Sequence, residues 1–149
     1  MKLSLAEFRA MNNPFRQALQ RWYEFPIFRS LGLPDQPGNV LEIGCGSGYG
    51  AILLASLQPL SYVGIDLMPE QIALAQKRNM AEVQFLVADA TNLSFLPSRS
   101  KDTVVIFGVL HHIPPWRKVI EECARVLRSG GLIFLEEPDM RLIVRWEKG

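Results

Sequence analysis

Short apolar runs alternate with helical segments along most of this chain of 149 residues. The runs are apolar at consecutive positions, which is typical of strands that are buried on both faces. Right-handed crossovers join such strands into one open parallel sheet. We therefore predict an α/β fold of the doubly wound, Rossmann-like type, with a mostly parallel sheet in the order 3-2-1-4-5. Its five strands are predicted at Val40–Ile43, Tyr62–Ile65, Val83–Val87, Thr103–Phe107 and Leu132–Leu135.

The chain is predicted to form a single domain over 1–149. Aromatic residues are scattered before the first predicted strand, and the spacing of Phe15, Leu19 and Trp22 is helical. We expect helices there, in front of the sheet-forming part. The predicted parts are an N-terminal helical lid at 1–34, a core with the binding loops at 38–137, and a short C-terminal tail at 138–149.

Charge and cysteine content exclude several classes of protein. Sixteen Lys and Arg residues against fifteen Asp and Glu residues give a net charge of +1, without the broad basic field of a nucleic-acid-binding protein. Cys45 and Cys123 are too few for a disulfide framework and lack metal-ligand spacing, so we predict reduced thiols, no metal and a cytoplasmic location. Glu7 and Arg9 interrupt the start, so no signal peptide is predicted, and no apolar run is long enough for a membrane span.

A glycine-rich loop follows the first predicted strand directly. Its three glycines, Gly44, Gly46 and Gly48, stand at alternate positions. They allow a tight turn and a close approach of the backbone to a ligand. The helix after the loop presents its positive end at the same place. In a doubly wound sheet, ligands bind outside the carboxyl ends of the strands, so this loop is predicted to form one wall of a binding site.

Two carboxylates follow the next two predicted strands. Asp66 comes 22 positions after Gly44 and can accept hydrogen bonds from both hydroxyls of a ribose, or cap the following helix, or do both. Leu67 can cover one face of an adenine. Asp89 can accept from an exocyclic amine while the Ala90 backbone N–H donates to a ring nitrogen. The alternative for Asp89 is a loop residue that makes its own turn.

Five segments occur in the order and spacing of a known family, and together they resemble the class I S-adenosylmethionine-dependent methyltransferases. The resemblance is to the small-molecule type that includes quinone-biosynthesis enzymes, and it covers about residues 38–137. It implies S-adenosylmethionine as cofactor and an enzyme that transfers a methyl group to a small-molecule acceptor by in-line displacement. The matching segments are Val40–Gly48, Val63–Asp66, Ala88–Ala90, Leu110–Pro114 and Arg125–Gly131.

The resemblance also implies roles for individual residues. The glycine loop would line the methionine part of the cofactor, the two carboxylates would bind the ribose and the adenine edge, and Leu67 would pack on the adenine. Glu42 would order the loop, with direct contact to the cofactor as the alternative, and Cys45 would be a small residue that fits rather than a nucleophile. The predicted cofactor-binding residues are Glu42, Gly44, Cys45, Gly46, Asp66, Leu67, Asp89, Ala90 and Gly108.

The catalytic candidates are His111 and His112, which follow the fourth predicted strand near the reacting end of the ligand. Placing the nucleophile supplies much of the catalysis, and a base is needed only if the acceptor loses a proton. An unperturbed histidine pKa near 6.5 suits a base. Because adjacent residues in an extended loop point apart, we expect at most one to face the site; both could instead hold the loop.

Among the N-terminal aromatics, Tyr23 is the lid candidate. Ile113 stands where amino methyltransferases carry Asn or Asp before two prolines, which counts against a nucleic-acid amine as acceptor.

The chain departs from the family after the fifth predicted strand. Family members continue with a helix and an antiparallel strand pair, whereas only 139–149 remain here. We therefore predict that the fifth strand is an exposed apolar edge, through which a homodimer could form. Two alternatives stay open: a non-catalytic interaction subunit with the methyltransferase fold, and an NAD-binding module. For the latter, Gly46–Ala51 fits Gly-x-Gly-x-x-Ala and Asp66 fits the ribose acid.

Overall fold

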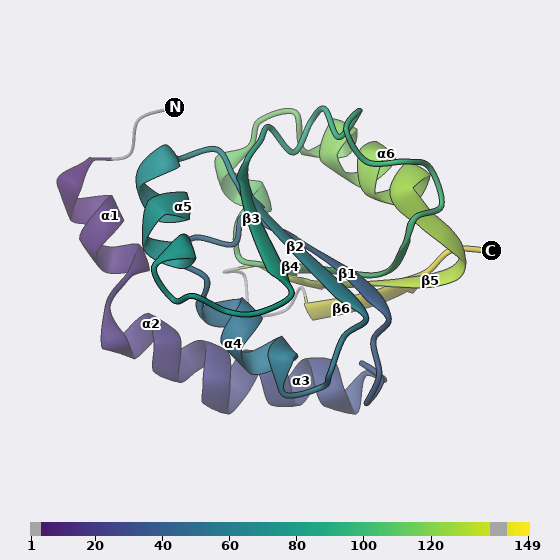
Figure 1. Cartoon of the computed structure of the whole chain (residues 1–149), viewed down its shortest axis with the longest axis horizontal. Helices are drawn as coiled ribbons and strands as arrows, with labels where there is room; N and C mark the ends of the chain where they lie inside the picture. The colour runs from purple at the N-terminus through teal and green to yellow at the C-terminus, as the bar shows by residue number, and fades with distance from the viewer. Residues whose placement is uncertain (1–3, 138–142) are drawn as a thin grey trace.

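The computed structural model of the chain describes residues 4–137 and 143–149. Six strands form one sheet in the order β3-β2-β1-β4-β5-β6, and all neighbours are parallel except β5 and β6, which are antiparallel (Figure 1). The predicted doubly wound fold and the order of its first five strands are confirmed. The strands are β1 (Asn39–Ile43), β2 (Ser61–Asp66), β3 (Val83–Val87), β4 (Lys101–Phe107), β5 (Leu127–Glu136) and β6 (Ile143–Glu147).

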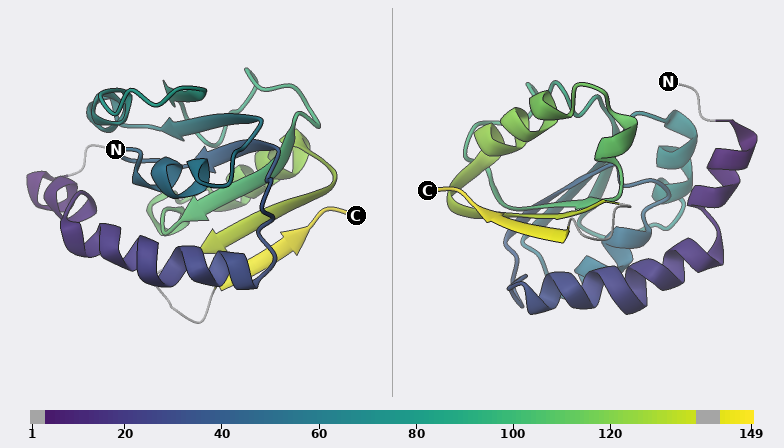
Figure 2. Two further views of the ribbon diagram at one scale, coloured as in Figure 1. Left: turned by 60° about the horizontal axis from the view of Figure 1, so that its bottom comes forward. Right: turned by 180° about the vertical axis from the view of Figure 1, so that it is seen from behind.

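Helices cover both faces of the sheet, as buried parallel strands require. Figure 2 shows α6 on one side and the N-terminal helices on the other. Alternate strand residues enter the two cores: Leu41 packs with Val119 under α6, and Val40 packs with Phe28 on the opposite face. The helices that follow the strands are α4 (Tyr49–Ala55), α5 (Pro69–Gln76), the short 3₁₀ turn η2 (Leu110–His112) and α6 (Trp116–Val126).

The N-terminal region is helical, and residues 14–30 form one continuous helical rod, which we call the rod. The Asn13 side chain accepts from the Arg16 backbone N–H at 2.8 Å, and Pro14 takes the first turn. A π-helical turn then interrupts the α-helix, a feature that occurs frequently at functional sites. Two residues of this turn, Gln20 and Glu24, are buried. The elements are α1 (Leu5–Met11), α2 (Pro14–Leu19), η1 (Gln20–Glu24) and α3 (Phe25–Ser30).

The prediction that the fifth strand is an exposed edge is wrong. β6 pairs antiparallel with β5, from Leu132 opposite Glu147 to Glu136 opposite Ile143. Five residues are enough to form hydrogen bonds with the outer side of β5, so no further helix is needed to cover that edge. The homodimer predicted through this edge loses its basis. Of the predicted tail, residues 138–142 lie outside the described residues.

The start of β5 also differs from the prediction. The fifth strand is predicted to begin at Leu132, but α6 ends at Val126 and β5 begins at the next residue, so Gly130 and Gly131 lie inside the strand. The pairing shifts between Lys101 and Thr103, where β5 bulges. Gly130 has a φ of +75° there, which a glycine tolerates. The two glycines therefore shape a bulge inside the strand.

Candidate functional site

Two adjoining cavities lie at the carboxyl ends of the parallel strands. The larger has a volume of about 410 Å³ and the smaller about 270 Å³. Gly44 lies between them with a φ of +68°, and a Cβ atom there would lie 2.6 Å from the Val109 side chain. Only glycine therefore fits between the loop and this side chain. The lining residues that the two cavities share are Met11, Gly44, Val109 and His112.

The smaller cavity combines apolar walls with two carboxylates. Asp66 and Asp89 line it together with Leu67 and Ala90, four of the residues predicted to hold an adenosine. The Leu67 side chain is exposed at this surface. An apolar slot with a few convergent polar groups is the usual form of a small-molecule site. The remaining apolar lining comes from Ile43, Ile65, Met68, Ala88, Ile113, Pro114 and Pro115.

Asp66 joins the glycine loop to the start of α5. Its carboxylate accepts hydrogen bonds from the backbone N–H groups of Gly46, at 3.0 Å, and Met68, at 2.9 Å. Burial raises the pKa of this carboxyl, against the opposing effect of these backbone hydrogen bonds. Met68, not Asp66, is the N-cap residue of α5. The carboxylate is therefore positioned by backbone groups of both the glycine loop and the start of α5.

Asp89 makes a turn of its own and also lines the cavity. Its Oδ1 accepts from the backbone N–H of Thr91 at 2.8 Å and from the Thr91 hydroxyl at 2.7 Å. These hydrogen bonds lower the pKa of the Asp89 carboxyl. The turn and the position in the smaller cavity therefore coexist, and the residue is ionised at neutral pH.

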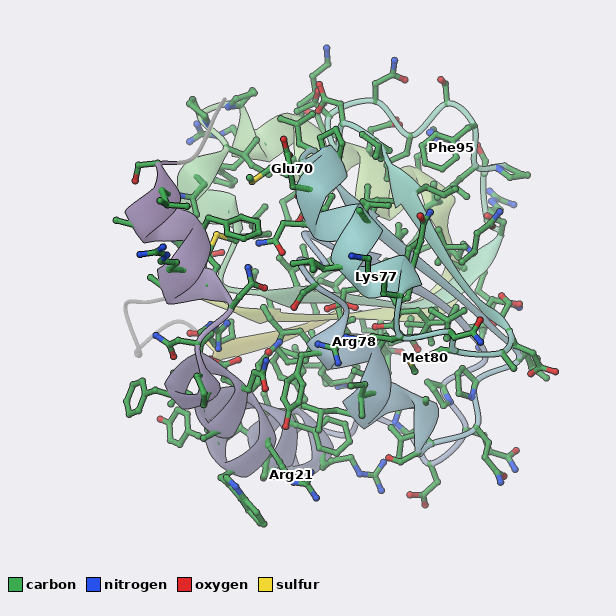
Figure 3. All side chains as sticks on the ribbon, turned by 60° about the vertical axis from the view of Figure 1, so that its left-hand side comes forward. Arg21, Glu70, Lys77, Arg78, Met80 and Phe95 are labelled. Atoms are coloured by element: carbon green, nitrogen blue, oxygen red, sulfur yellow. The ribbon has the colours of Figure 1, made fainter. Side chains whose placement is uncertain are left out.

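The larger cavity is lined by polar side chains that the sequence reasoning did not single out. The rod contributes Arg16, Gln20 and Glu24, which are four residues apart and therefore share one helix face. Gln71 of α5 is fully buried, and neither atom of its amide has a hydrogen-bond partner among the described residues. These three polar residues recur at helical spacing in an otherwise aromatic segment, and that pattern could have predicted a polar face on the helix. Figure 3 shows Arg21, which lies outside that face, on the outer side of the rod.

A compact group of charges forms the far wall of the larger cavity. Arg16 donates from Nη1 to Oε1 of Glu24 at 2.6 Å, and its Nη2 lies 4.0 Å from Oε2 of Glu136. Glu24 is 1% exposed and Glu136, the last residue of β5, is 4% exposed. Burial raises the pKa of both carboxyls, that of Glu136 to about 7. We call Arg16, Glu24 and Glu136 the carboxyl cluster.

Both histidines line the larger cavity, against the expectation that at most one would face it. The reason is that η2 is a 3₁₀ turn rather than an extended loop, so the two rings lie close together, with centroids 3.8 Å apart and planes tilted by 45°. Nδ1 of His111 lies 2.8 Å from Oε2 of Glu137. The same carboxylate accepts from the backbone N–H groups of Leu110, at 2.8 Å, and His111, at 3.2 Å. Glu137 therefore fixes both the turn and the ring.

Glu42 lies behind the glycine loop and lines neither cavity. It is 1% exposed and accepts a hydrogen bond from the Tyr62 hydroxyl. A Cβ atom on Gly50 of α4 would clash with its carboxyl, so this glycine is needed for close packing. Burial raises the pKa of Glu42 to about 8. On the other side of the loop, Arg78, which follows α5 in the chain, donates a hydrogen bond from its side chain to the Ser47 carbonyl (Figure 3).

Three further predicted residues have different surroundings. Cys45 lines the larger cavity but is 5% exposed, and burial raises the pKa of its thiol well above the usual range. Gly108 lines the same cavity with a φ of +60°. A Cβ atom there would lie 3.1 Å from Glu136 and 3.3 Å from Arg16. Tyr23 is 36% exposed and lines neither cavity; Gln20 and Glu24 face the site from that turn instead.

Within residues 4–137 and 143–149, no group of three or more His, Cys, Asp or Glu side chains could hold a metal ion. None of the helices in the same ranges is both long and apolar enough to cross a bilayer.

Comparison with known proteins agrees with this geometry. A family model described as a methyltransferase domain matches residues 41–135, which is more than half of the chain. The chain belongs to the class I S-adenosylmethionine-dependent methyltransferases. The match extends from β1 into β5 and so includes the carboxyl ends of β1, β2, β3 and β4. It favours the methyltransferase prediction over the NAD-binding alternative.

Several curated relatives and solved structures are similar to this chain. The fatty-acid O-methyltransferase of Mycolicibacterium smegmatis is 38% identical over 131 residues, 85% of this chain and 47% of the relative. The phthiotriol/phenolphthiotriol dimycocerosates methyltransferase of Mycobacterium leprae is 38% identical over 112 residues, 73% of this chain and 41% of the relative. The PH0226 protein of Pyrococcus horikoshii has a TM-score of 0.73 at 26% identity, over 88% of this chain and 62% of that one. The chain thus spans less than half the length of these two curated relatives.

Proposed function

We propose that this chain transfers a methyl group from S-adenosylmethionine to a small-molecule acceptor. The observation that carries the proposal is the pair of adjoining cavities at the glycine loop, one apolar with two carboxylates and one polar. The adenosine of the cofactor would occupy the smaller cavity. The methionine part would pass Gly44 into the larger cavity, where the acceptor meets the methyl group.

The smaller cavity fits an adenosine by the chemistry of its walls. The Asp66 carboxylate can accept hydrogen bonds from ribose hydroxyls, which are its preferred partners in sites of this topology. Asp89 can accept from the exocyclic amine of adenine, with the Ala90 N–H as donor to a ring nitrogen. Leu67 offers apolar surface to one face of the base, because it is 52% exposed where it borders the cavity.

The larger cavity fits the amino-acid end of the cofactor through Gln71. An amide that is fully buried without partners costs free energy unless a ligand satisfies it. Its N–H group can donate to a carboxylate and its oxygen can accept from an ammonium group, and the amino-acid end carries both. We propose that Gln71, with the backbone of Gly44 and Gly46, binds this end.

The reaction needs positioning and, for a protonated acceptor, a proton acceptor. When bound, S-adenosylmethionine supplies an electrophilic methyl group with a good leaving group. The rod and the glycine loop enclose the space beside Gly108 and reduce the access of water. The groups on this wall that can take a proton are the carboxyl cluster and the two histidines. His111 and His112 remain proposed catalytic residues because both line the larger cavity, and His112 also lines the smaller one.

Catalysis is tested with methyl-labelled S-adenosylmethionine and a panel of small acceptors. Long-chain acids, alcohols and phenols are included because the two curated relatives are named for fatty-acid and dimycocerosate substrates. We expect labelled product from at least one acceptor, and less product from the Asp66→Ala variant when the cofactor concentration is below saturation. Tight binding of S-adenosylhomocysteine without transfer to any acceptor would instead indicate the non-catalytic interaction subunit.

Gln71→Leu should weaken S-adenosylhomocysteine binding about 10-fold, because a charge-assisted hydrogen bond is worth about 1.5–3 kcal/mol. The affinity for 5′-methylthioadenosine, which lacks the amino-acid end, should not change. Calorimetric titration of both ligands into both proteins measures the two ratios. An equal loss for both ligands would place the effect of Gln71 in the fold rather than in the amino-acid subsite.

A further inference from the structure

The carboxyl cluster is a buried charged site that the cofactor assignment does not use. Among the described residues that line the two cavities, Arg16 is the only Lys or Arg. It forms its 2.6 Å hydrogen bond with Oε1 of Glu24, while the only group among the described residues that can donate to the second oxygen of Glu24 is the Glu136 carboxyl, and only when it is protonated. A buried carboxylate oxygen of this kind requires a donor. When Glu136 is ionised, the wall of the larger cavity therefore has an unused hydrogen-bond acceptor.

The charges of the cluster balance only when it carries one proton. Two carboxylates and one guanidinium sum to a net charge of −1 when all three are ionised, and to zero with one proton bound. An unbalanced buried charge is unfavourable, so the cluster retains a proton at higher pH than an exposed carboxyl does. Burial and the charge of Glu24 raise the pKa of Glu136 to about 7. The cluster can therefore exchange one proton close to neutral pH.

The position of Glu136 places this proton beside the reacting end of the site. Glu136 pairs with Phe107 across β4 and β5, and its backbone carbonyl accepts from the Gly108 N–H at 2.8 Å. Its Oε2 would lie 3.1 Å from a Cβ atom on Gly108, so the absence of a side chain at Gly108 leaves the carboxyl open to the cavity. The His111 side chain, by contrast, is 40% exposed and already paired with Glu137. Glu136 is the more deeply buried proton acceptor.

The cluster discriminates between classes of acceptor. A carboxylate acceptor has no proton to lose and would be repelled by two carboxyls. An amine would bind as an ammonium ion, which has no lone pair for attack. A hydroxyl group is neutral, can donate to a carboxylate, and has a proton that must leave. The cluster therefore matches a hydroxyl better than either charged group.

Resting on the proposed function, we propose that the carboxyl cluster binds the hydroxyl group of the acceptor and that Glu136 takes its proton. The acceptor is then an alcohol or a phenol, and the product is a methyl ether. In the step, the hydroxyl oxygen forms a bond to the methyl carbon while the carbon–sulfur bond breaks and its electron pair stays on sulfur. The hydroxyl proton moves to the Glu136 carboxylate, while Glu24 stays paired with Arg16.

The test uses binding as well as transfer, with matched probes. The chain is first saturated with S-adenosylhomocysteine, whose affinity shows that the cofactor site is intact. Calorimetry then measures the binding of 1-dodecanol, 4-nonylphenol, dodecanoate and dodecylamine. Glu136→Gln is the test variant. Glu121→Gln is the control, because Glu121 is exposed on α6 and lines neither cavity.

We expect the hydroxyl probes to bind, and to bind about 10-fold more tightly at about pH 8 than at about pH 6, because the ionised fraction of a group with a pKa of about 7 rises by that factor. Glu136→Gln should remove this pH dependence, leave the affinity for S-adenosylhomocysteine within about 2-fold of the unmodified chain, and lower kcat for methyl ether formation at least about 100-fold. Glu121→Gln should match the unmodified chain.

Three results would overturn the inference: stronger binding of dodecanoate or dodecylamine than of both hydroxyl probes, no binding of either hydroxyl probe, or a pH dependence that persists in Glu136→Gln. The last of these results would mean that His111 or His112, and not Glu136, is the proton acceptor. Failure of the proposed function looks different, since S-adenosylhomocysteine itself would then fail to bind the unmodified chain.

Discussion

Asp66→Ala is expected to weaken S-adenosylhomocysteine binding about 10- to 150-fold, corresponding to about 1.5–3 kcal/mol for a charge-assisted hydrogen bond. The carboxylate is 8% exposed, faces the smaller cavity and is positioned by the N–H groups of Gly46 and Met68. The substitution removes the ribose acceptor and releases the loop that lies against the methionine part. Isothermal titration calorimetry on both proteins gives the ratio of the two affinities.

Two control variants separate these contributions. Asp66→Asn keeps one acceptor oxygen and should lose less affinity than Asp66→Ala. Asp35→Ala removes an exposed carboxylate, whose partner is Arg29 and which lines neither cavity, and should leave the affinity unchanged. An Asp66→Ala variant that binds as well as the unmodified chain would remove Asp66 from the cofactor site.

Glu42→Gln is expected to change how the free energy of unfolding depends on pH. Burial raises the pKa of Glu42 from 4.5 to about 8, so the folded state binds a proton that the unfolded state has released over this range. The stability of the unmodified chain therefore falls as pH rises from about 5 to about 8. One pKa unit corresponds to about 1.4 kcal/mol, so Glu42 alone contributes a loss on the order of 4 kcal/mol.

The glutamine variant cannot ionise and should lack this part of the pH dependence. Urea unfolding at several values between about pH 5 and about pH 8 measures how steeply the free energy of unfolding changes with pH in each protein. Glu136 changes the stability in the same direction as Glu42, but it does so in both proteins. The difference between the two slopes therefore reports Glu42 alone. Glu70→Gln, at an exposed site on α5, should keep the slope of the unmodified chain. Equal slopes for Glu42→Gln and the unmodified chain would mean that Glu42 is ionised in the folded state throughout.

The sheet and the cofactor side of the site could be predicted from the sequence because each depends on residues that are close together along the chain. Val83–Val87 is a strand exactly where its apolar run predicts one, and the glycine loop needs backbone angles that its own residues supply. Carboxylates at the ends of parallel strands meet at one edge whatever the details of packing. Asp66 and Asp89 were therefore predictable as neighbours across the smaller cavity before any tertiary contact was known.

The acceptor side depends on contacts between distant segments, and sequence patterns do not contain these. Arg16 and Glu136 are 120 positions apart and meet only because the rod crosses the end of β5. In the π-helical turn, Glu24 is buried and lines the larger cavity, whereas Tyr23 is 36% exposed and lines neither cavity. Helical spacing places Glu24 on the same face as Arg16, but it does not show that this face packs against the end of β5. Pairing of β6 with β5 is likewise a tertiary event, since Ile143–Glu147 is too short to be assigned from its own pattern.

The central claim is that the two adjoining cavities hold S-adenosylmethionine, and its most direct test is calorimetric titration of this chain with S-adenosylhomocysteine, with NAD as the comparison ligand. We expect saturable one-to-one binding of S-adenosylhomocysteine and no binding of NAD. Binding of NAD in its place, or of neither ligand to the folded chain, would contradict the claim.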